Sequence, residues 1–94
     1  MDREVEKIAG ERILSVLVRG RQKTYFAGNV KAVSSVNKKG PFDILPLHEN
    51  FITLIAGIIT IRPSMVDTKI EVPIIAGVLK VKDNKVEIYI SKEK

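Results

Sequence analysis

Polar and apolar residues alternate with a period near two over most of the chain, a pattern typical of β-strands. Gly, Pro, Asn and Asp residues interrupt the alternating segments at short intervals, as turns do between strands. We therefore expect an all-β fold, a flattened β-sandwich of about nine to ten short strands, with no long helix. Nine such segments are visible, at residues 13–18, 24–26, 30–36, 42–45, 51–56, 58–62, 66–72, 74–82 and 85–90.

The turns between these segments predict how the strands end and pair. Arg19-Gly20-Arg21 and Asp83-Asn84 are typical hairpin turns, so we expect the strands on either side of each turn to pair. Gly28-Asn29 and Gly57 are interpreted as breaks between strands, and Pro73 as the end of the strand before it. That preceding segment, 66–72, has the clearest alternation of a half-buried strand.

The chain divides into one domain and two short ends. We interpret residues 1–11 as a charged N-terminal extension with weak helical spacing, 12–91 as the β-sandwich domain and 92–94 as a polar tail. The charged start has no feature of a secretory signal peptide. The longest nearly uncharged run, residues 50–61, is too short to span a bilayer, so we expect a soluble protein.

The charge is unevenly distributed along the chain. The formal net charge is +5, and residues 12–40 contain seven basic residues and no acidic one. A basic block of this kind favours an acidic partner, whether nucleic acid, anionic lipid or an acidic protein surface, although it also serves as an ordinary solubilising surface.

Candidate catalytic chemistry is scarce. There is no Cys, and His48 is the only histidine, so neither a thiol nucleophile nor a usual zinc site is expected. No phosphate-binding glycine loop occurs, and the carboxylates are scattered singly. We interpret His48 as a structural or interface residue in a loop. A catalytic, metal-binding or pH-sensing role is the weaker interpretation. We predict no catalytic residue, cofactor or metal.

Apolar residues exceed what one inward face of each strand requires. Adjacent pairs such as Phe51-Ile52, Ile58-Ile59 and Ile74-Ile75 must point to opposite faces of a strand. The surplus predicts either a closed, barrel-like core with long residues at its rim or an exposed apolar patch that binds a partner.

Three segments resemble the N-terminal domain of the epsilon subunit of F-type ATP synthases. GPFDILPLHENFIT at 40–53 is similar to that family's segment around Leu-Pro-x-His. TYFAGNVKAVSSV at 24–36 resembles an upstream strand, and IIAGVLKVKDNKVEIYI at 74–90 resembles a downstream glycine-containing hairpin. The order and spacing of the three agree over about residues 12–91.

The resemblance implies a function without chemistry of its own. It implies a non-catalytic rotor subunit in the central stalk of a proton- or sodium-translocating ATP synthase, coupling the gamma subunit to the c-ring by protein–protein contacts. It also implies a peripheral location at the cytoplasmic face of the membrane, reached only through the complex. By position in the family, the loop Lys38, Lys39, Gly40, Pro41 and Phe42 would face the c-ring, and Gly20, His48 and Thr53 would face gamma.

The chain departs from the family pattern in three respects. Pro41 occupies a position that is commonly acidic, and Lys38 and Lys39 precede it, so the charge of the proposed c-ring loop is reversed. Nothing in the sequence corresponds to the family's C-terminal helical hairpin, so the inhibition and ATP binding associated with that hairpin are not expected. Ala76 occupies a position that is often Gly, and Leu47 occupies one that is often Gly or Asn.

The alternative function is a basic small β-barrel that binds nucleic acid. Such a protein would stack bases on exposed aromatic side chains beside the basic block. The candidates are Tyr25, Phe26, Phe42, Phe51 and Tyr89. An enzyme of another kind is a third possibility, for which the sequence offers no acid–base pair or metal-binding set.

Overall fold

The computed structural model describes residues 13–94, and these residues form six β-strands and no helix. The charged extension predicted at residues 1–11 lies outside the described residues. The strands are β1 (Leu14–Arg19), β2 (Thr24–Asn37), β3 (Gly40–Ile44), β4 (Phe51–Pro63), β5 (Ile70–Lys82) and β6 (Lys85–Glu93). Ile, Val and Leu dominate them, because β-branched and aliphatic side chains suit a pleated, half-buried surface.

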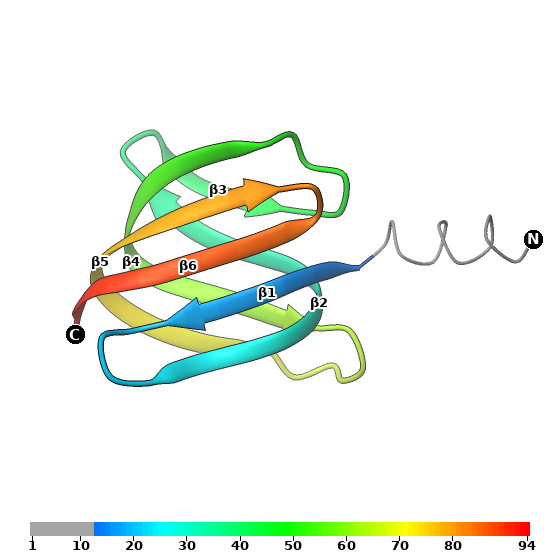
Figure 1. Cartoon of the computed structure of the whole chain (residues 1–94), viewed down its shortest axis with the longest axis horizontal. Helices are drawn as coiled ribbons and strands as arrows, with labels where there is room; N and C mark the ends of the chain where they lie inside the picture. The colour runs from blue at the N-terminus through cyan, green and yellow to red at the C-terminus, as the bar shows by residue number, and fades with distance from the viewer. Residues whose placement is uncertain (1–12) are drawn as a thin grey trace, which may run out of the picture.

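The strands join into one strongly curved sheet that closes on itself. Their order is β1-β6-β5-β4-β2-β3, and β1 also pairs with β2. Figure 1 shows β1 between β2 and β6, with β2 and β4 curving around the molecule. The β1–β6 pair is parallel and the other pairs are antiparallel. This closure leaves β3 paired only with β2.

The core is aliphatic and lies inside the curved sheet. Along β1, and along β6 as far as Ile90, every second side chain is buried, which is the expected consequence of alternation. Phe42, Phe51 and four other partly buried residues pack against the core at its margins. No buried side-chain polar atom among residues 13–94 lacks a hydrogen-bond partner. The buried cluster consists of Leu14, Val16, Val18, Val30, Val33, Ile44, Ile55, Ile59, Ile61, Ile74, Leu79, Val81, Val86, Ile88 and Ile90.

The all-β sandwich class is confirmed, but the strands are fewer and longer than the sequence predicted. Three predicted pairs of short strands are continuous in the structure, within β2, β4 and β5. Gly28-Asn29 and Gly57 lie inside strands, and the register of β4 shifts between Ile55 and Gly57. A bulge bends a strand without ending it. One long, bent strand therefore stands where two strands were expected.

Two further expectations along β5 were wrong. Pro73 does not end a strand, because it lies inside β5, opposite Ile58 and next to the bulge at Gly57. The β5–β6 pairing begins at Ile74, so the other edge of β5 is unpaired at Pro73, and proline is tolerated at such an edge. The segment 66–69 is a loop despite its alternation, since the last β4–β5 pair is Ile61 with Ile70. Alternation alone does not supply a neighbouring strand.

The two predicted hairpins are confirmed. β1 and β2 pair across the turn that contains Gly20, and β5 and β6 pair across Asp83-Asn84. Asp83 and Asn84 have φ values of 49° and 64°. Two successive positive φ values are typical of the two-residue turns that match the twist of a hairpin, and Asp and Asn tolerate them.

Candidate protein–protein interface

Apolar side chains gather on the outer surface of the sheet, over β4, β5, β6 and β1. The register places Leu54 beside Val78 and Val78 beside Tyr89. In the adjacent row, Ile52 lies beside Lys80, Lys80 beside Glu87, and Glu87 beside Leu17. We call this surface the outer face and define it by its apolar members Leu17, Ile52, Leu54, Val78 and Tyr89. Residues far apart in sequence thus form one continuous surface.

The outer face is substantially exposed to solvent. Leu54 is 73% exposed, Ile52 66% and Tyr89 46%. A shallow depression of about 400 Å³ runs between Leu17 and Tyr89, with Arg19, Lys80 and Glu87 among its lining residues. Exposed apolar side chains of this kind, here interrupted by Lys80 and Glu87, are common at protein-binding sites. The structure therefore supports the exposed-patch alternative for the apolar surplus.

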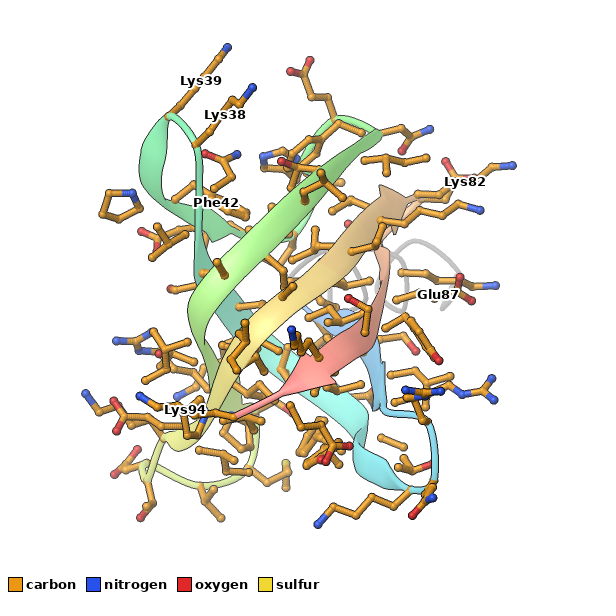
Figure 2. The ribbon with its side chains drawn as sticks, turned by 90° about the vertical axis from the view of Figure 1, so that its left-hand side faces the viewer. Lys38, Lys39, Phe42, Lys82, Glu87 and Lys94 are labelled. Carbon is orange, nitrogen blue, oxygen red and sulfur yellow. The ribbon has the colours of Figure 1, made fainter. Side chains whose placement is uncertain are left out.

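The predicted c-ring loop forms the tip of the β2–β3 hairpin. Lys38 and Lys39 extend from this tip into solvent (Figure 2). The tip is shaped by Asn37, whose side-chain oxygen accepts a hydrogen bond from the Lys39 amide at 2.9 Å, and by Gly40 with φ 118°. Pro41 is exposed, whereas the Phe42 ring turns inward and meets the edge of the Phe51 ring at 6.1 Å.

His48 and Thr53 lie close to this hairpin. The His48 ring packs 5.0 Å from the ring of Phe51. Its Nδ1 lies 2.7 Å from the Glu49 carbonyl, which fixes the ring in the loop before β4. The Asn37 side-chain amide donates a hydrogen bond of 3.1 Å to the Thr53 hydroxyl. No catalytic partner faces His48 in these contacts, which fit the interpretation of a structural loop residue.

Gly20 lies at the opposite end of the molecule from His48. Gly20 neighbours Glu93 at the end of β6, whereas Leu47, next to His48, bonds Asn84 just before β6 begins. A Cβ atom on Gly20 would lie 2.7 Å from the Glu93 carboxylate and 2.8 Å from the Tyr25 ring, so only glycine fits there without movement. A gamma-facing surface that included Gly20, His48 and Thr53 would therefore span the length of β6.

Tyr25 is the one described residue with a clearly shifted pKa. Its hydrogen bond to the Glu93 carboxylate raises the pKa of the phenol above 10.0, and partial desolvation and the negative charge of Glu93 add to this effect. The ammonium group of Lys23 lies 4.5 Å above the same ring. These contacts tie the β1–β2 turn to the end of β6, which is a structural arrangement rather than a reactive one.

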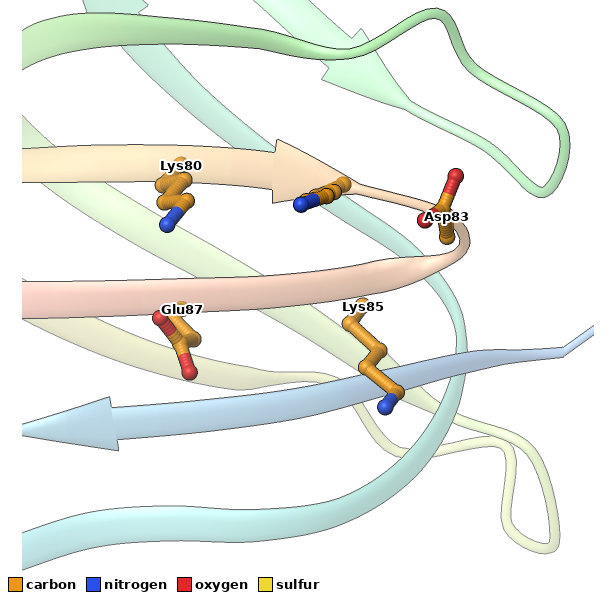
Figure 3. Close-up of a pocket in the computed structure, with 5 residues that line it drawn as sticks. Lys80, Asp83, Lys85 and Glu87 are labelled. Atoms are coloured by element: carbon orange, nitrogen blue, oxygen red, sulfur yellow. The ribbon is translucent and has the colours of Figure 1, made fainter.

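A polar depression of about 320 Å³ lies beside the outer face, at the β5–β6 turn. Lys80, Lys82, Asp83, Lys85 and Glu87 line it, and Figure 3 shows their side chains spread along the two strands. All five are exposed. Solvated charges spread along a hairpin suit the charged margin of an interface better than acid–base catalysis.

Metal-binding and membrane-crossing features are not found within residues 13–94. No group of three or more His, Cys, Asp or Glu side chains there is placed to hold a metal ion. The described residues also contain no helix long and apolar enough to cross a membrane.

The arrangement of aromatic and basic residues does not favour nucleic-acid binding. Of the five aromatic candidates, only Tyr89 is classed as exposed; Tyr25, Phe26, Phe42 and Phe51 pack against the core. The basic block is also divided, with Arg19 and Arg21 near the β1–β2 turn and Lys38 and Lys39 on the other hairpin. A base-stacking platform needs several exposed rings beside the cations.

Sequence reasoning missed Leu17 and Tyr89 as members of the outer face. The alternation of apolar and polar residues around them predicted strands. Only the register between neighbouring strands places them on the same face as Leu54 and Val78. Nothing local in the sequence encodes that register, since the strands are contributed by segments far apart in the chain.

A small, closed β-sandwich with an exposed apolar surface is an architecture typical of protein-binding domains. The sequence matches the family described as "ATP synthase, Delta/Epsilon chain, beta-sandwich domain" over residues 14–92. The chain therefore belongs to this family, and the resemblance found in the sequence is confirmed.

Solved structures share the fold. One is a chain of the Euglena gracilis mitochondrial ATP synthase, in a structure of OSCP, F1 and c-ring, with a TM-score of 0.79 and 19% identity over 88% of this chain and 53% of that one. Another is a chain of the Tetrahymena thermophila mitochondrial ATP synthase, in a structure of the central stalk and c-ring, with a TM-score of 0.65 and 17% identity over 84% of this chain and 63% of that one. The chain thus spans less than two thirds of either neighbour. No curated protein sequence matches it.

Proposed function

We propose that this domain is a non-catalytic subunit of the central stalk of an ATP synthase, coupling the gamma subunit to the c-ring by protein–protein contacts. The observation that carries the proposal is the family match over residues 14–92, joined to an exposed apolar outer face. In this role the domain works peripherally, at the cytoplasmic face of a membrane, and transmits torque through its contacts. The coupling ion is a proton or sodium.

The outer face supplies the driving force for association in this proposal. Burying an exposed Leu or Ile side chain is worth about 1.5–3 kcal/mol, before the cost of association. Leu54 and Ile52 together therefore offer about 3–6 kcal/mol before that cost, which corresponds to about 10²- to 10⁴-fold in binding. The other members of the proposed gamma-facing set lie off this face: the Thr53 side chain points to the opposite side of β4, His48 lies in the preceding loop, and Gly20 lies at the far end of the molecule.

The β2–β3 hairpin tip is the proposed contact with the c-ring. Lys38 and Lys39 are exposed there, and Gly40, Pro41 and Phe42 hold the tip against the body of the domain. Because the tip is basic, we expect its partner loop to carry acidic residues or to be flanked by phospholipid headgroups.

Co-purification tests the proposal directly. The tagged full chain is expected to retain gamma and c-ring proteins from solubilised membranes of its source, and Leu54→Asp is expected to reduce gamma recovery at least ten-fold. Met65→Asp serves as the matched control, because Met65 is 90% exposed and lies in the β4–β5 loop, away from the outer face. The proposal is contradicted if Leu54→Asp leaves the recovery of both gamma and c-ring proteins unchanged. It is also contradicted if the unaltered chain retains neither of them.

A further inference from the structure

The first half of β4 is paired along only one of its two edges within residues 13–94. Residues 51–55 pair with 77–81 of β5, whereas the pairing of β4 with β2 involves only residues from Ala56 onward. The β2–β4 ladder is irregular between Ser34 and Val36, where the Ser35 hydroxyl bonds the Ile58 carbonyl at 2.8 Å, and the strands part beyond their last pair, Val36 with Ala56. Within residues 13–94 no strand pairs with the other edge of residues 51–55, where the Leu54 carbonyl accepts only a 3.3 Å hydrogen bond from the Thr53 hydroxyl. This edge is therefore able to pair with another strand.

A groove of about 800 Å³ lies in the fork between the diverging strands. Its walls are residues 36–39, from the end of β2 and the following turn, and residues 51–56 of β4. The hydrogen bond from Asn37 to Thr53 crosses it at 3.1 Å, and this side-chain bridge must open for a strand to pair beside Thr53. The volume lies in the range of ligand-binding clefts, about 300–1,000 Å³. Five free residues of β4 would pair with an extended segment about 17 Å long.

The rim of the groove carries positive charge. Lys38 and Lys39 line it, and no acidic residue does. Within residues 13–94 the one ion pair is Lys69 with Glu71, so neither rim lysine is neutralised by the described part of the chain. Ile52 and Leu54 alternate along the free strand and are 66% and 73% exposed. The site is thus complementary to a strand that carries acidic and apolar residues in alternation.

We propose that this groove binds an extended, acidic segment of a neighbouring protein subunit by strand addition to the free edge of β4. Backbone hydrogen bonds to residues 51–55 align the segment. Its apolar side chains pack beside Ile52 and Leu54, and its carboxylates face Lys38 and Lys39. The proposal concerns the groove alone and does not depend on which complex contains the domain.

Nuclear magnetic resonance of the ¹⁵N-labelled full chain tests it with two peptides, Ac-EVEVEVE-NH2 and Ac-KVKVKVK-NH2. The acidic peptide is expected to shift the amides of residues 36–39 and 51–55 and to slow their hydrogen exchange, with at least ten-fold tighter binding than the basic peptide. Lys38→Glu with Lys39→Glu is expected to reverse this preference. Lys92→Glu with Lys94→Glu changes the net charge equally, with Lys94 at the end of the molecule opposite Lys38 (Figure 2), and is expected to leave the preference unchanged.

Three results would overturn the proposal: no shifts at residues 51–55, equal affinity for the two peptides, or unchanged selectivity in the Lys38 and Lys39 double variant with a native-like spectrum. Vesicles containing anionic lipid provide a further arm. Perturbation of the Lys38 and Lys39 amides by vesicles but not by the acidic peptide would identify a lipid-binding tip and also overturn it. Failure of the proposed stalk function would instead be seen in the co-purification experiment, as a tagged chain that retains neither gamma nor c-ring proteins.

Discussion

Leu47 has a backbone conformation that its side chain disfavours. Its φ is 70°, in the left-handed region, and its side chain is 67% exposed, so packing does not compensate for the strain. Its amide donates a hydrogen bond to the Asn84 side chain, which holds the loop before β4 against the β5–β6 turn. Left-handed geometry costs an ordinary L-residue about 1–2 kcal/mol, whereas Asn tolerates it better. This explains physically why a Gly or Asn would suit the position before His48.

Leu47→Asn is therefore expected to raise the free energy of unfolding by about 0.5–1 kcal/mol. Urea denaturation measures the change as a higher midpoint at constant slope. Leu45→Asn is the matched control, since Leu45 is also exposed, at 54%, but its φ is not positive. Equal effects of the two substitutions would show that removal of an exposed leucine, not relief of strain, is responsible.

Tyr25 provides a pH-dependent contribution at the opposite end of the molecule. Because Glu93 raises the folded-state pKa of the phenol, the neutral form is favoured by folding. This stabilisation is fully present below the unfolded pKa of about 10 and is lost as the pH rises through the higher folded pKa.

An ultraviolet titration can isolate Tyr25 in a Tyr89→Phe background, which leaves one tyrosine. The phenol is expected to titrate above pH 10, and Glu93→Ala is expected to lower its pKa towards the ordinary value. Glu87→Ala, at the other end of β6, removes the same charge and should leave the titration unchanged. A pKa that does not respond to Glu93→Ala would contradict the assigned cause.

At the scale of the elements, bends within strands matter more than turns between them. β4 changes direction at Gly57, where φ is 88° and the register with β5 shifts. A Cβ atom there would meet no heavy atom within 4 Å, so the requirement for glycine comes from backbone conformation alone. The bend also separates β4 from the end of β2 and thereby opens the groove.

Gly57→Ala is expected to lower the free energy of unfolding by about 1–2 kcal/mol, because Ala must adopt a positive φ. Gly28→Ala is its control: Gly28 also lies within a strand, has no positive φ, and would place its Cβ in ordinary contact with Phe26 at 3.4 Å. Thermal or urea unfolding should leave Gly28→Ala within about 0.5 kcal/mol of the unaltered chain. Comparable losses for both would mean that flexibility, not φ, determines the effect.

At the scale of the whole molecule, the closed sheet divides the apolar residues into two sets with different consequences. Ile59 is fully buried in the core, whereas Leu54 on the same strand is 73% exposed. Ile59→Ala is expected to cost about 2–5 kcal/mol of stability, because it leaves a cavity. Leu54→Ala should change stability by less than about 0.5 kcal/mol.

Chemical denaturation of the two variants, combined with the co-purification assay, separates folding from association. Leu54→Ala is expected to weaken partner recovery while the unfolding midpoint stays near that of the unaltered chain. A large loss of stability in Leu54→Ala would indicate that the outer face belongs to the core and is not available to a partner.

Features that depend on near neighbours along the chain follow from the sequence alone. Alternating Ile, Val and Leu predict strands, and Asp83-Asn84 predicts its hairpin, because each is governed by φ/ψ preferences and side-chain direction over a few residues. The segment from Gly40 to Thr53 also predicted the family to which the chain belongs.

Only the tertiary structure decided which face of each strand lies inward, how Leu17, Leu54 and Tyr89 meet, and where β2 parts from β4. These outcomes depend on lateral register between segments such as those of Val36 and Ala56, and a shift of one residue would exchange the two faces. Bulges set that register where the strands pack together in three dimensions. The local alternation of polar and apolar residues is the same on either side of a bulge, so it does not reveal the register.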